Sequence, residues 1–265
     1  MSTLWSAHGS GRTQLPGFER ASGWGPLIET HEPTLQLLHT GEIEVLGLLP
    51  YSSNYTFLAR ISAPDQQALC VYKPQKGERP LWDFPPGTLA AREVAAWEID
   101  RAAGWNFVPP TILREAAPMG PGSFQLFIDH DPERHYFVLM EERAEELKSL
   151  AVLDAVINNA DRKSGHVLED GSGKLWAVDH GLTFNTEPKL RTVIWAYADE
   201  PLGDRLRRDL EILGSKLSDA ELAGRLSTLL SEQETAATLA RIEALLIEDR
   251  FPGPSSDRPL PWPLI

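Results

Sequence analysis

The chain is short of the features that mark secreted and membrane proteins. Its 265 residues include one cysteine, Cys70, which cannot form an internal disulfide and lies in an apolar, strand-like run. Such cysteine usage is typical of a reducing compartment. No apolar run reaches the length of about 18 residues expected of a membrane helix, and the first residues lack the pattern of a secretory signal. We therefore expect a cytoplasmic protein with no membrane insertion.

Positive charge is also scarce. The chain has 25 Lys and Arg against 38 Asp and Glu, which gives a formal net charge of −13. An acidic surface favours solubility, and it repels nucleic acids and anionic lipid headgroups at long range. No dense Lys/Arg cluster offsets this repulsion. We expect no nucleic-acid partner.

Several common catalytic motifs are missing. The sequence contains no Gly-x4-Gly-Lys-Ser/Thr phosphate loop, no Gly-x-Gly-x-x-Gly opening a helix, no Gly-x-Ser-x-Gly elbow and no Cys/His cluster with zinc spacing. These absences argue against P-loop enzymes, dinucleotide-binding domains, serine hydrolases and structural zinc sites.

What is present divides into four parts. Residues 1–31 are predicted to be a flexible arm, residues 32–130 strands with one long helix, and residues 131–250 mostly helices that include a polar loop. Residues 251–265 are rich in proline and should be extended. Strands followed by helices favour an α+β fold of two lobes with a cleft between them.

Residue patterns place the individual elements. Runs of β-prone residues predict strands within 43–63, 68–74, 108–113, 123–128, 136–140 and 174–179. Helical patterns occur at 32–38, 88–104, 145–158 and, as two or three helices, within 204–249. Thr88 and Gly104 are suited to cap the second helix, and Ser218 with Glu221 forms a predicted capping box.

The most informative region is a polar loop that follows an apolar helix. The loop contains Asp161, and the next short strand ends in Asp179, which is followed by His180 and Gly181. Metal-assisted phosphoryl transfer needs two such carboxylates. One orients an acceptor hydroxyl and takes its proton, and the other holds a hard cation such as Mg²⁺.

Upstream residues could complete a nucleotide site. Lys73 ends a buried-looking strand, and Glu93, on the helix that follows, could orient this lysine as its counter-ion. Glu98, another carboxylate on the same helix and expected to be exposed, is the alternative partner. The small polar turn that contains Ser52 and Ser53 lies between the first two strands, where its backbone and hydroxyls could cover phosphates.

Together these segments resemble the phosphoinositide 3-/4-kinase-like superfamily, which includes the HipA-type serine kinases, over roughly residues 43–200. The catalytic loop of that superfamily is Asn-x-Asp-Arg-His-x-x-Asn, and residues 159–166 of this chain are Asn-Ala-Asp-Arg-Lys-Ser-Gly-His. The metal-binding Asp of the superfamily, followed one residue later by Gly, matches Asp179-His180-Gly181. The whole chain is also similar to an uncharacterised actinobacterial family of kinase-like proteins.

The resemblance implies an ATP-dependent phosphotransferase that uses Mg²⁺ or Mn²⁺. It implies that Asp161 is the catalytic base, Asp179 a metal ligand and Lys73 the phosphate-binding lysine. The strand ending near residue 128 would lead into the hinge that borders adenine, through Phe127 and Ile128.

Two positions depart from the superfamily pattern. Lys163 stands where the family has a histidine, and it could neutralise charge on the transferred phosphate. His166 stands where the family has a metal-binding asparagine. A histidine suits softer ions such as Mn²⁺ better than Mg²⁺, and it could instead make a structural hydrogen bond to the loop backbone.

Three functions stay open at this point. The first is transfer of the γ-phosphoryl group of ATP to a hydroxyl of a protein or small soluble molecule, which the acidic surface favours over a lipid. The second is a pseudokinase that binds nucleotide or a partner without catalysis, motivated by Lys163 and His166. The third is transfer of AMP on the same fold.

Overall fold

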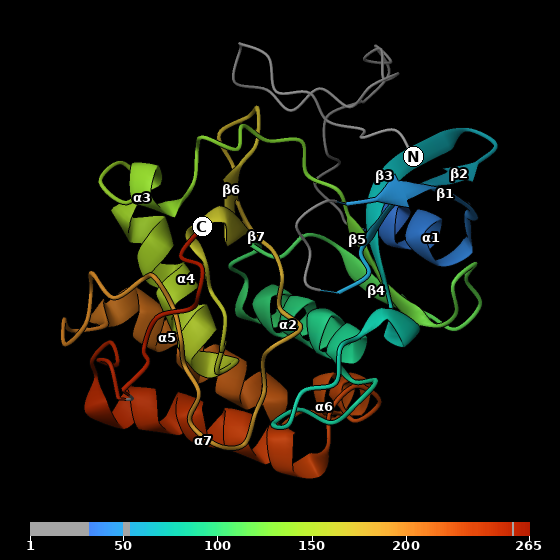
Figure 1. Cartoon of the computed structure of the whole chain (residues 1–265). Helices are drawn as coiled ribbons and strands as arrows, with labels where there is room; N and C mark the ends of the chain where they lie inside the picture. The colour runs from blue at the N-terminus through green and yellow to red at the C-terminus, as the bar shows by residue number, and fades with distance from the viewer. Residues whose placement is uncertain (1–31, 50–53, 256) are drawn as a thin grey trace.

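The computed structural model describes residues 32–49, 54–255 and 257–265. The predicted arm, residues 1–31, and the turn residues Ser52 and Ser53 lie outside this part of the chain. The first half builds a five-stranded antiparallel sheet in the order β1-β2-β3-β5-β4 (Figure 1). Its strands are β1 (Glu42–Leu48), β2 (Phe57–Ala63), β3 (Gln66–Pro74), β4 (Thr111–Arg114) and β5 (Gly122–Leu126).

β3 lies in the middle of this sheet, between β2 and β5. Cys70 pairs with Ala59 on one side and with Leu126 on the other, and its side chain is fully buried. Apolar residues at consecutive positions therefore fit a strand covered on both faces, as the sequence predicted. The register also fixes the end of β3, where Lys73 pairs with Ser123 of β5.

The helix α2 (Leu89–Ala103) joins the sheet to the helical half. It contacts β4 and β5 as well as two later helices, α5 (Gly203–Leu217) and α6 (Ala220–Leu226), and most of its side chains are buried. It ends at Gly104, whose φ of 79° gives the left-handed cap predicted from the sequence. Thr88 precedes the helix but caps none of its N–H groups with its side chain.

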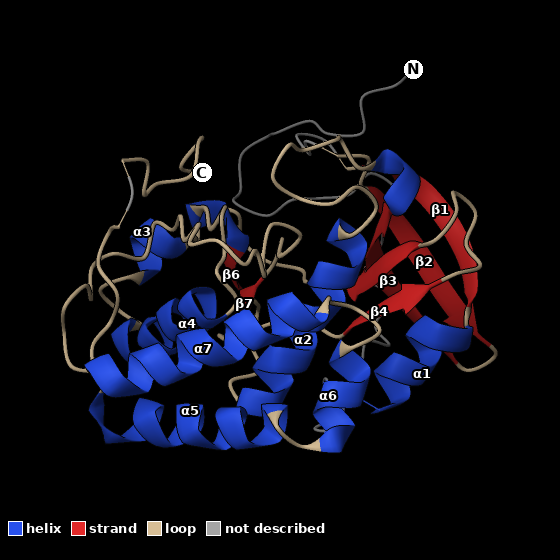
Figure 2. Cartoon of the chain, turned by 90° about the horizontal axis from the view of Figure 1, so that it is seen from below, coloured by secondary structure: helices blue, strands red, loops and turns tan. Residues whose placement is uncertain are grey.

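The second half is mostly helical and lies to one side of the sheet, with α2 between them (Figure 2). Its elements are α3 (Tyr136–Leu139), α4 (Ala144–Val156), β6 (Val167–Glu169), β7 (Leu175–Ala177), α5 (Gly203–Leu217), α6 (Ala220–Leu226) and α7 (Glu232–Glu248). α1 (Glu32–Thr40) packs on the sheet, and two 3-10 turns, η1 (Gln75–Gly77) and η2 (Ser164–His166), complete the set for the described residues. No helix in the described ranges is long and apolar enough to cross a membrane.

Two local predictions are wrong. The run at residues 136–140 forms the helix α3, not a strand, because Tyr136 and Leu139 lie three apart and both enter the core as a helical turn allows. Ser218 ends α5, and the residue before α6, Asp219, makes no side-chain cap. The capping box lies instead at the start of α7.

Candidate functional site

The side chain of Lys73 links two carboxylates from distant parts of the chain. Its ammonium group hydrogen-bonds to Glu93 Oε1 and lies 2.7 Å from Asp179 Oδ1. Burial alone would lower the pKa of Lys73, but the negative charges of Asp179 and Glu93 outweigh it and raise the pKa above its usual range. The lysine is therefore cationic at every physiological pH.

The two glutamates of α2 have different partners. Glu93 is almost fully buried, and its Oε2 accepts a 3.0 Å hydrogen bond from the backbone N–H of His180. Glu98 is also buried, which corrects the expectation of an exposed carboxylate, and it pairs with Arg225 of α6 at 2.9 Å. The structure thus brings Glu93 to Lys73 and leaves Glu98 out of the site.

Asp179 follows β7 in a left-handed backbone conformation, with φ of 63°. About half of its side chain is exposed (49%), so the carboxylate is open to solvent or a ligand. The ammonium of Lys73 holds the pKa of Asp179 far below its usual range. The carboxylate stays ionised, as a ligand for a hard cation must.

His166 faces the same carboxylate. Its Nε2 lies 3.4 Å from Asp179 Oδ2, and burial lowers the pKa of His166 to about 4, so that the ring is neutral. Its Nδ1 accepts a 3.4 Å hydrogen bond from the backbone N–H of Lys163. The geometry gives the bond to the loop backbone directly. With Nδ1 accepting, the neutral ring carries its proton on the Nε2 that faces Asp179, so binding a metal there requires the other tautomer.

Asp161 and Lys163 form an ion pair on the loop. The Lys163 Nζ lies 3.0 Å from Asp161 Oδ2, and the backbone N–H of Asp161 donates to Asn159 Oδ1 at 3.0 Å. Burial raises the pKa of Asp161, with Lys163 opposing the shift. The pair places a carboxylate and a cation together at the position where a base and a charge-neutralising group are expected.

Sequence reasoning assigned no role to Arg162, yet this fully buried side chain organises the loop. Its guanidinium pairs with Asp154 at 2.9 Å and donates to the Val178 carbonyl at 2.9 Å. It also lies 2.7 Å from His180 Nε2, so His180 makes an orienting contact. Because Val178 and His180 flank Asp179, Arg162 ties the two acidic segments together. The sequence did offer one signal of this role, because Arg162 directly follows Asp161 in the loop motif.

Asn158 supports the chain that follows Asp179. Its side-chain amide donates to the carbonyls of Asn185 and Glu187 at 2.8 and 2.7 Å, and its carbonyl accepts from the backbone N–H of Lys189 at 2.9 Å. Asn158 therefore anchors residues 185–189, whereas Asp154 holds the loop through its ion pair with Arg162.

The predicted adenine-binding residues lie just beyond β5. The backbone N–H of Phe127 donates to Leu69 of β3 at 2.9 Å, and the carbonyl of the buried Ile128 lies 2.9 Å from His130 Nδ1. The role of Phe127 and Ile128 as the border of adenine stays a prediction.

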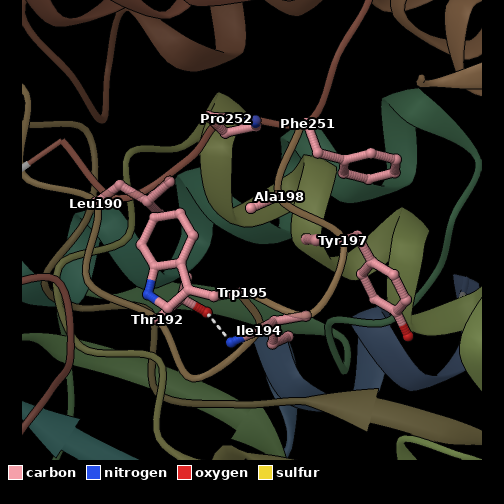
Figure 3. Close-up of a pocket in the computed structure, with 9 residues that line it drawn as sticks. Leu190, Thr192, Ile194, Trp195, Tyr197, Ala198, Phe251 and Pro252 are labelled. Atoms are coloured by element: carbon pink, nitrogen blue, oxygen red, sulfur yellow. Dashed lines mark hydrogen bonds between the residues drawn. The ribbon is translucent and has the colours of Figure 1, made fainter. Parts of the chain in front are cut away.

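A small hollow elsewhere in the molecule holds none of the predicted site residues. Apolar side chains dominate its wall (Figure 3). The residues are Ala151, Leu190, Thr192, Ile194, Trp195, Tyr197, Ala198, Phe251 and Pro252. It is a packing gap under the start of the tail, and it offers no carboxylate or cation for phosphate chemistry.

The carboxylate cluster fits a metal bound together with a nucleotide. Within residues 32–49, 54–255 and 257–265, no group of three or more His, Cys, Asp and Glu side chains is arranged to hold a metal by itself. Mg²⁺ usually takes one or two protein carboxylates and fills its other positions with phosphate oxygens and water. The half-exposed Asp179, with neutral His166 beside it, matches that requirement.

Comparison with known proteins identifies the family of the chain. The family described as Phosphatidylinositol 3- and 4-kinase matches residues 93–226, which span Glu93, the catalytic-type loop and Asp179. The chain belongs to this family. Protein Rv2133c of Mycobacterium tuberculosis (strain ATCC 25618 / H37Rv) is 38% identical over 266 residues, covering 86% of this chain and 94% of that protein.

A plant relative shares a shorter region. Phosphatidylinositol 4-kinase gamma 4 of Oryza sativa subsp. japonica is 32% identical over 158 residues, which cover 52% of this chain and 27% of the plant protein. Among solved structures, the Golgi casein kinase with Mn/ADP bound superposes with a TM-score of 0.51 at 14% identity, over 82% of this chain and 74% of that one. This likeness confirms the predicted two-lobed, α+β, kinase-like fold.

Proposed function

We propose that the chain is an ATP-dependent phosphotransferase that moves the γ-phosphoryl group of ATP to a hydroxyl acceptor. The observation that carries the proposal is the contact of Lys73 with both Glu93 and Asp179. A lysine on a central strand, its glutamate on the adjoining helix and a metal-ligand aspartate are the parts that hold a nucleotide's phosphates in kinases. Membership of the family and the fold support the same reading.

Each residue of the cluster has a definite task in this proposal. Lys73 binds phosphate oxygens, and Glu93 keeps its ammonium in place. Asp179 and His166 would hold Mg²⁺ or Mn²⁺, which neutralises charge on the phosphate oxygens when bound. Asp161 orients the acceptor hydroxyl and takes its proton, and its raised pKa improves its strength as a base.

Lys163 has a distinct part. Its ammonium, 3.0 Å from Asp161, is placed to neutralise charge on the group in transfer, in the position where the superfamily has a histidine. The nucleotide lies between the lobes formed by residues 32–130 and 131–250, with Phe127 and Ile128 at adenine.

We propose a protein or small soluble molecule as the acceptor. The net charge of −13 disfavours approach to an anionic membrane. A pseudokinase is the second candidate, favoured by the Lys163–Asp161 ion pair, which engages one of the base's oxygens. The name of the plant relative makes an inositol lipid an acceptor to include in any assay.

Thermal unfolding tests the proposal directly. Wild type, Asp179→Asn and, as a control, Asp65→Asn on the exposed β2–β3 turn are heated with ATP, ADP or AMP and with Mg²⁺ or Mn²⁺. Ligand at a hundred times its dissociation constant adds about 2.7 kcal/mol, which shifts the midpoint by several degrees. We expect a metal-dependent ATP shift in wild type and Asp65→Asn that is lost in Asp179→Asn.

The absence of any nucleotide shift in wild type would overturn both the kinase and the nucleotide-binding pseudokinase. If ATP binds, mass spectrometry of the protein and of candidate acceptors separates the remaining candidates. A gain of one phosphate supports the proposal, a gain of AMP replaces it with nucleotidyl transfer, and no gain on any acceptor supports the pseudokinase.

A further inference from the structure

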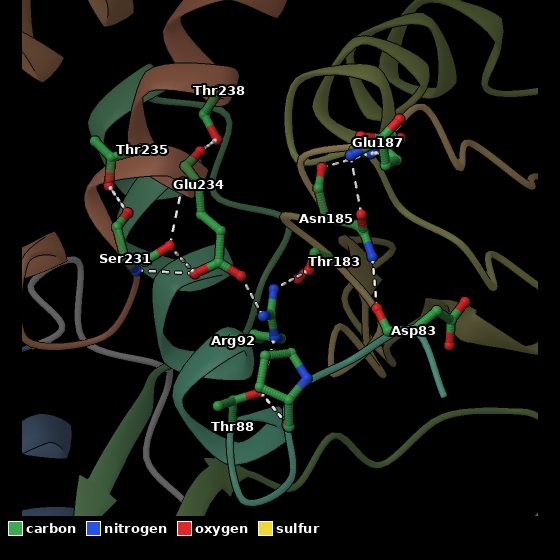
Figure 4. Close-up of polar contacts among 12 residues, drawn as sticks. Asp83, Thr88, Arg92, Thr183, Asn185, Glu187, Ser231, Glu234, Thr235 and Thr238 are labelled. Atoms are coloured by element: carbon green, nitrogen blue, oxygen red, sulfur yellow. Dashed lines mark hydrogen bonds and ion pairs between the residues drawn. The ribbon is translucent and has the colours of Figure 1, made fainter. Parts of the chain in front are cut away.

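Arg92, the residue before Glu93 on α2, carries a buried charge that the proposed chemistry does not use. Its side chain is almost wholly enclosed and lies between α7 and the chain that follows Asp179 (Figure 4). The guanidinium forms an ion pair with Glu234 and donates to the Thr183 carbonyl at 2.5 Å. Its Nε donates to Thr88 Oγ1 at 3.2 Å.

Glu234 is itself held rigidly at the start of α7. Its Oε2 accepts a 2.8 Å hydrogen bond from the backbone N–H of Ser231, and its own backbone N–H donates to Ser231 Oγ at 3.3 Å; these two bonds form the capping box of this helix. Burial would raise the pKa of Glu234, but the bonds from Ser231 and the charge of Arg92 lower it. Arg92 therefore binds an ionised carboxylate whose position is set by the helix end.

Arg92 and Glu93, which are adjacent on α2, hold the two ends of the turn formed by residues 180–183. Glu93 accepts from the backbone N–H of His180, and Arg92 donates to the carbonyl of Thr183. The Thr183 hydroxyl donates to the His180 carbonyl at 2.7 Å and closes the turn. At Gly181 between them, a Cβ would lie 3.4 Å from the Leu89 Cβ, so the turn rests directly on α2.

This turn begins at the residue after Asp179, whose left-handed backbone is thereby fixed from its C-terminal side. We propose that Arg92, anchored by Glu234, is a positioning residue for the metal–nucleotide site: it clamps the His180–Thr183 turn and so aims the carboxylate of Asp179. The inference rests on the proposed role of Asp179 as metal ligand. It assigns Arg92 no contact with nucleotide.

A purely structural role predicts a different outcome. Breaking a buried ion pair destabilises the fold wherever it lies, without changing the metal dependence of ligand binding. Arg92→Lys separates the two roles, because one ammonium keeps a charge near Glu234 but lacks the planar fork that reaches Thr183 at the same time. Arg225→Lys is the matched control: Arg225 also anchors α2, through Glu98, and its other ion-pair partner is Glu221 of α6.

The experiment is calorimetric titration of the full chain with ADP over a range of Mn²⁺ concentrations, alongside urea unfolding without ligand. Residues that orient a metal ligand change metal affinity by about 10- to 100-fold when replaced. We expect Arg92→Lys to raise the Mn²⁺ concentration needed for tight ADP binding by at least about tenfold, with ADP affinity in EDTA unchanged. Arg225→Lys should leave the Mn²⁺ dependence unchanged.

A second variant guards against misfolding of the first. Glu234→Gln keeps the side-chain size but removes the anchoring charge, and it should shift the Mn²⁺ dependence in the same direction by a smaller factor. Wild-type Mn²⁺ dependence in both Arg92→Lys and Glu234→Gln would overturn the inference and leave the proposed function standing. Failure of wild type to bind ADP with Mn²⁺ would overturn the proposed function itself, and the inference with it.

Discussion

Lys73 donates a 2.7 Å hydrogen bond to Asp179 across 106 positions of the chain. The second oxygen of Asp179 faces His166 at 3.4 Å, so both carboxylate oxygens already have partners within the protein. A cation bound by Asp179 would therefore share the carboxylate with a lysine. This sharing makes nucleotide and metal binding interdependent, because phosphate oxygens would contact both the ammonium and the cation.

Replacing the partner of Lys73 should weaken nucleotide binding selectively. Glu93→Gln removes the charge that orients the ammonium, and we expect the Mg²⁺–ATP dissociation constant to rise about tenfold. Glu98→Gln, five residues along α2, breaks the Arg225 pair on another face and should leave that constant unchanged. Calorimetric titration of both variants decides the point. Equal affinities in the two variants would exclude Glu93 as the lysine's functional partner.

The loop ion pair should control turnover and not binding. Asp161→Asn removes the base, so we expect kcat to fall by about 10²- to 10⁴-fold while the ATP-induced thermal shift is kept. This is the reverse of the result expected for Asp179→Asn, where the shift is lost. Single-turnover transfer to the identified acceptor provides the measurement. A loss of ATP binding in Asp161→Asn would contradict the assignment of separate roles.

Lys163 distinguishes an active kinase from a pseudokinase. If its ammonium neutralises charge in the transfer, Lys163→Met should lower kcat by about 10²-fold or more with little change in the KM for ATP. If the lysine instead blocks Asp161, the same replacement should create or increase transfer. Lys163→His restores the residue type of the superfamily loop and serves as the matched comparison in the same assay.

The buried carboxyl of Asp100 should make stability depend on pH. Burial raises its pKa to about 7, although its Oδ2 accepts a 2.7 Å bond from the backbone N–H of Val108. Below a pH of about 4 the group is protonated in both states, and as pH rises toward 7 only the unfolded chain gives up the proton. The folded state therefore loses stability over this interval.

Asp100→Asn isolates this contribution, because an amide does not titrate. We expect the free energy of unfolding of wild type to fall relative to the variant by roughly 3 kcal/mol between pH 5 and pH 8. Urea unfolding of both proteins at several pH values supplies the difference. A constant difference in the free energy of unfolding across this range would show that the pKa of Asp100 is the same in the folded and unfolded states.

The sequence was most informative where chemistry is local. The spacing of Asp161 and Asp179 and the strand-end position of Lys73 are properties of short segments. In the fold Lys73 contacts Asp179, and Asp161 lies near enough for the charge of Asp179 to raise its pKa. The clamp by Arg92 could not be predicted, because Glu234 lies 142 positions away and only tertiary packing brings it near. The residue pattern also fails to predict secondary structure where a run suits both a strand and a helix, as in the β-prone run that forms α3.

The tail residues 259–265 should support the catalytic-type loop. The Pro259 carbonyl accepts from the backbone N–H of Thr192 and from the indole of Trp195, both at 3.1 Å. The Leu264 carbonyl accepts at 2.7 Å from the backbone N–H of Ser164, the residue after Lys163. The Leu264 bond holds the loop directly, and the Pro259 bonds hold Thr192 and Trp195, of which Thr192 pairs with Arg162 of the loop.

Deletion of residues 259–265 removes these acceptors. We expect a loss of about 1–2 kcal/mol in the free energy of unfolding and a fall in kcat of about tenfold, because small displacements of reacting groups are costly. ATP affinity should persist, since the ion pairs that join Lys73, Glu93 and Asp179 involve no tail residue. Trp262→Ala, at a tail side chain that is 87% exposed, is the control and should match wild type. A truncated protein with wild-type kcat would show that the loop holds its catalytic geometry without the tail.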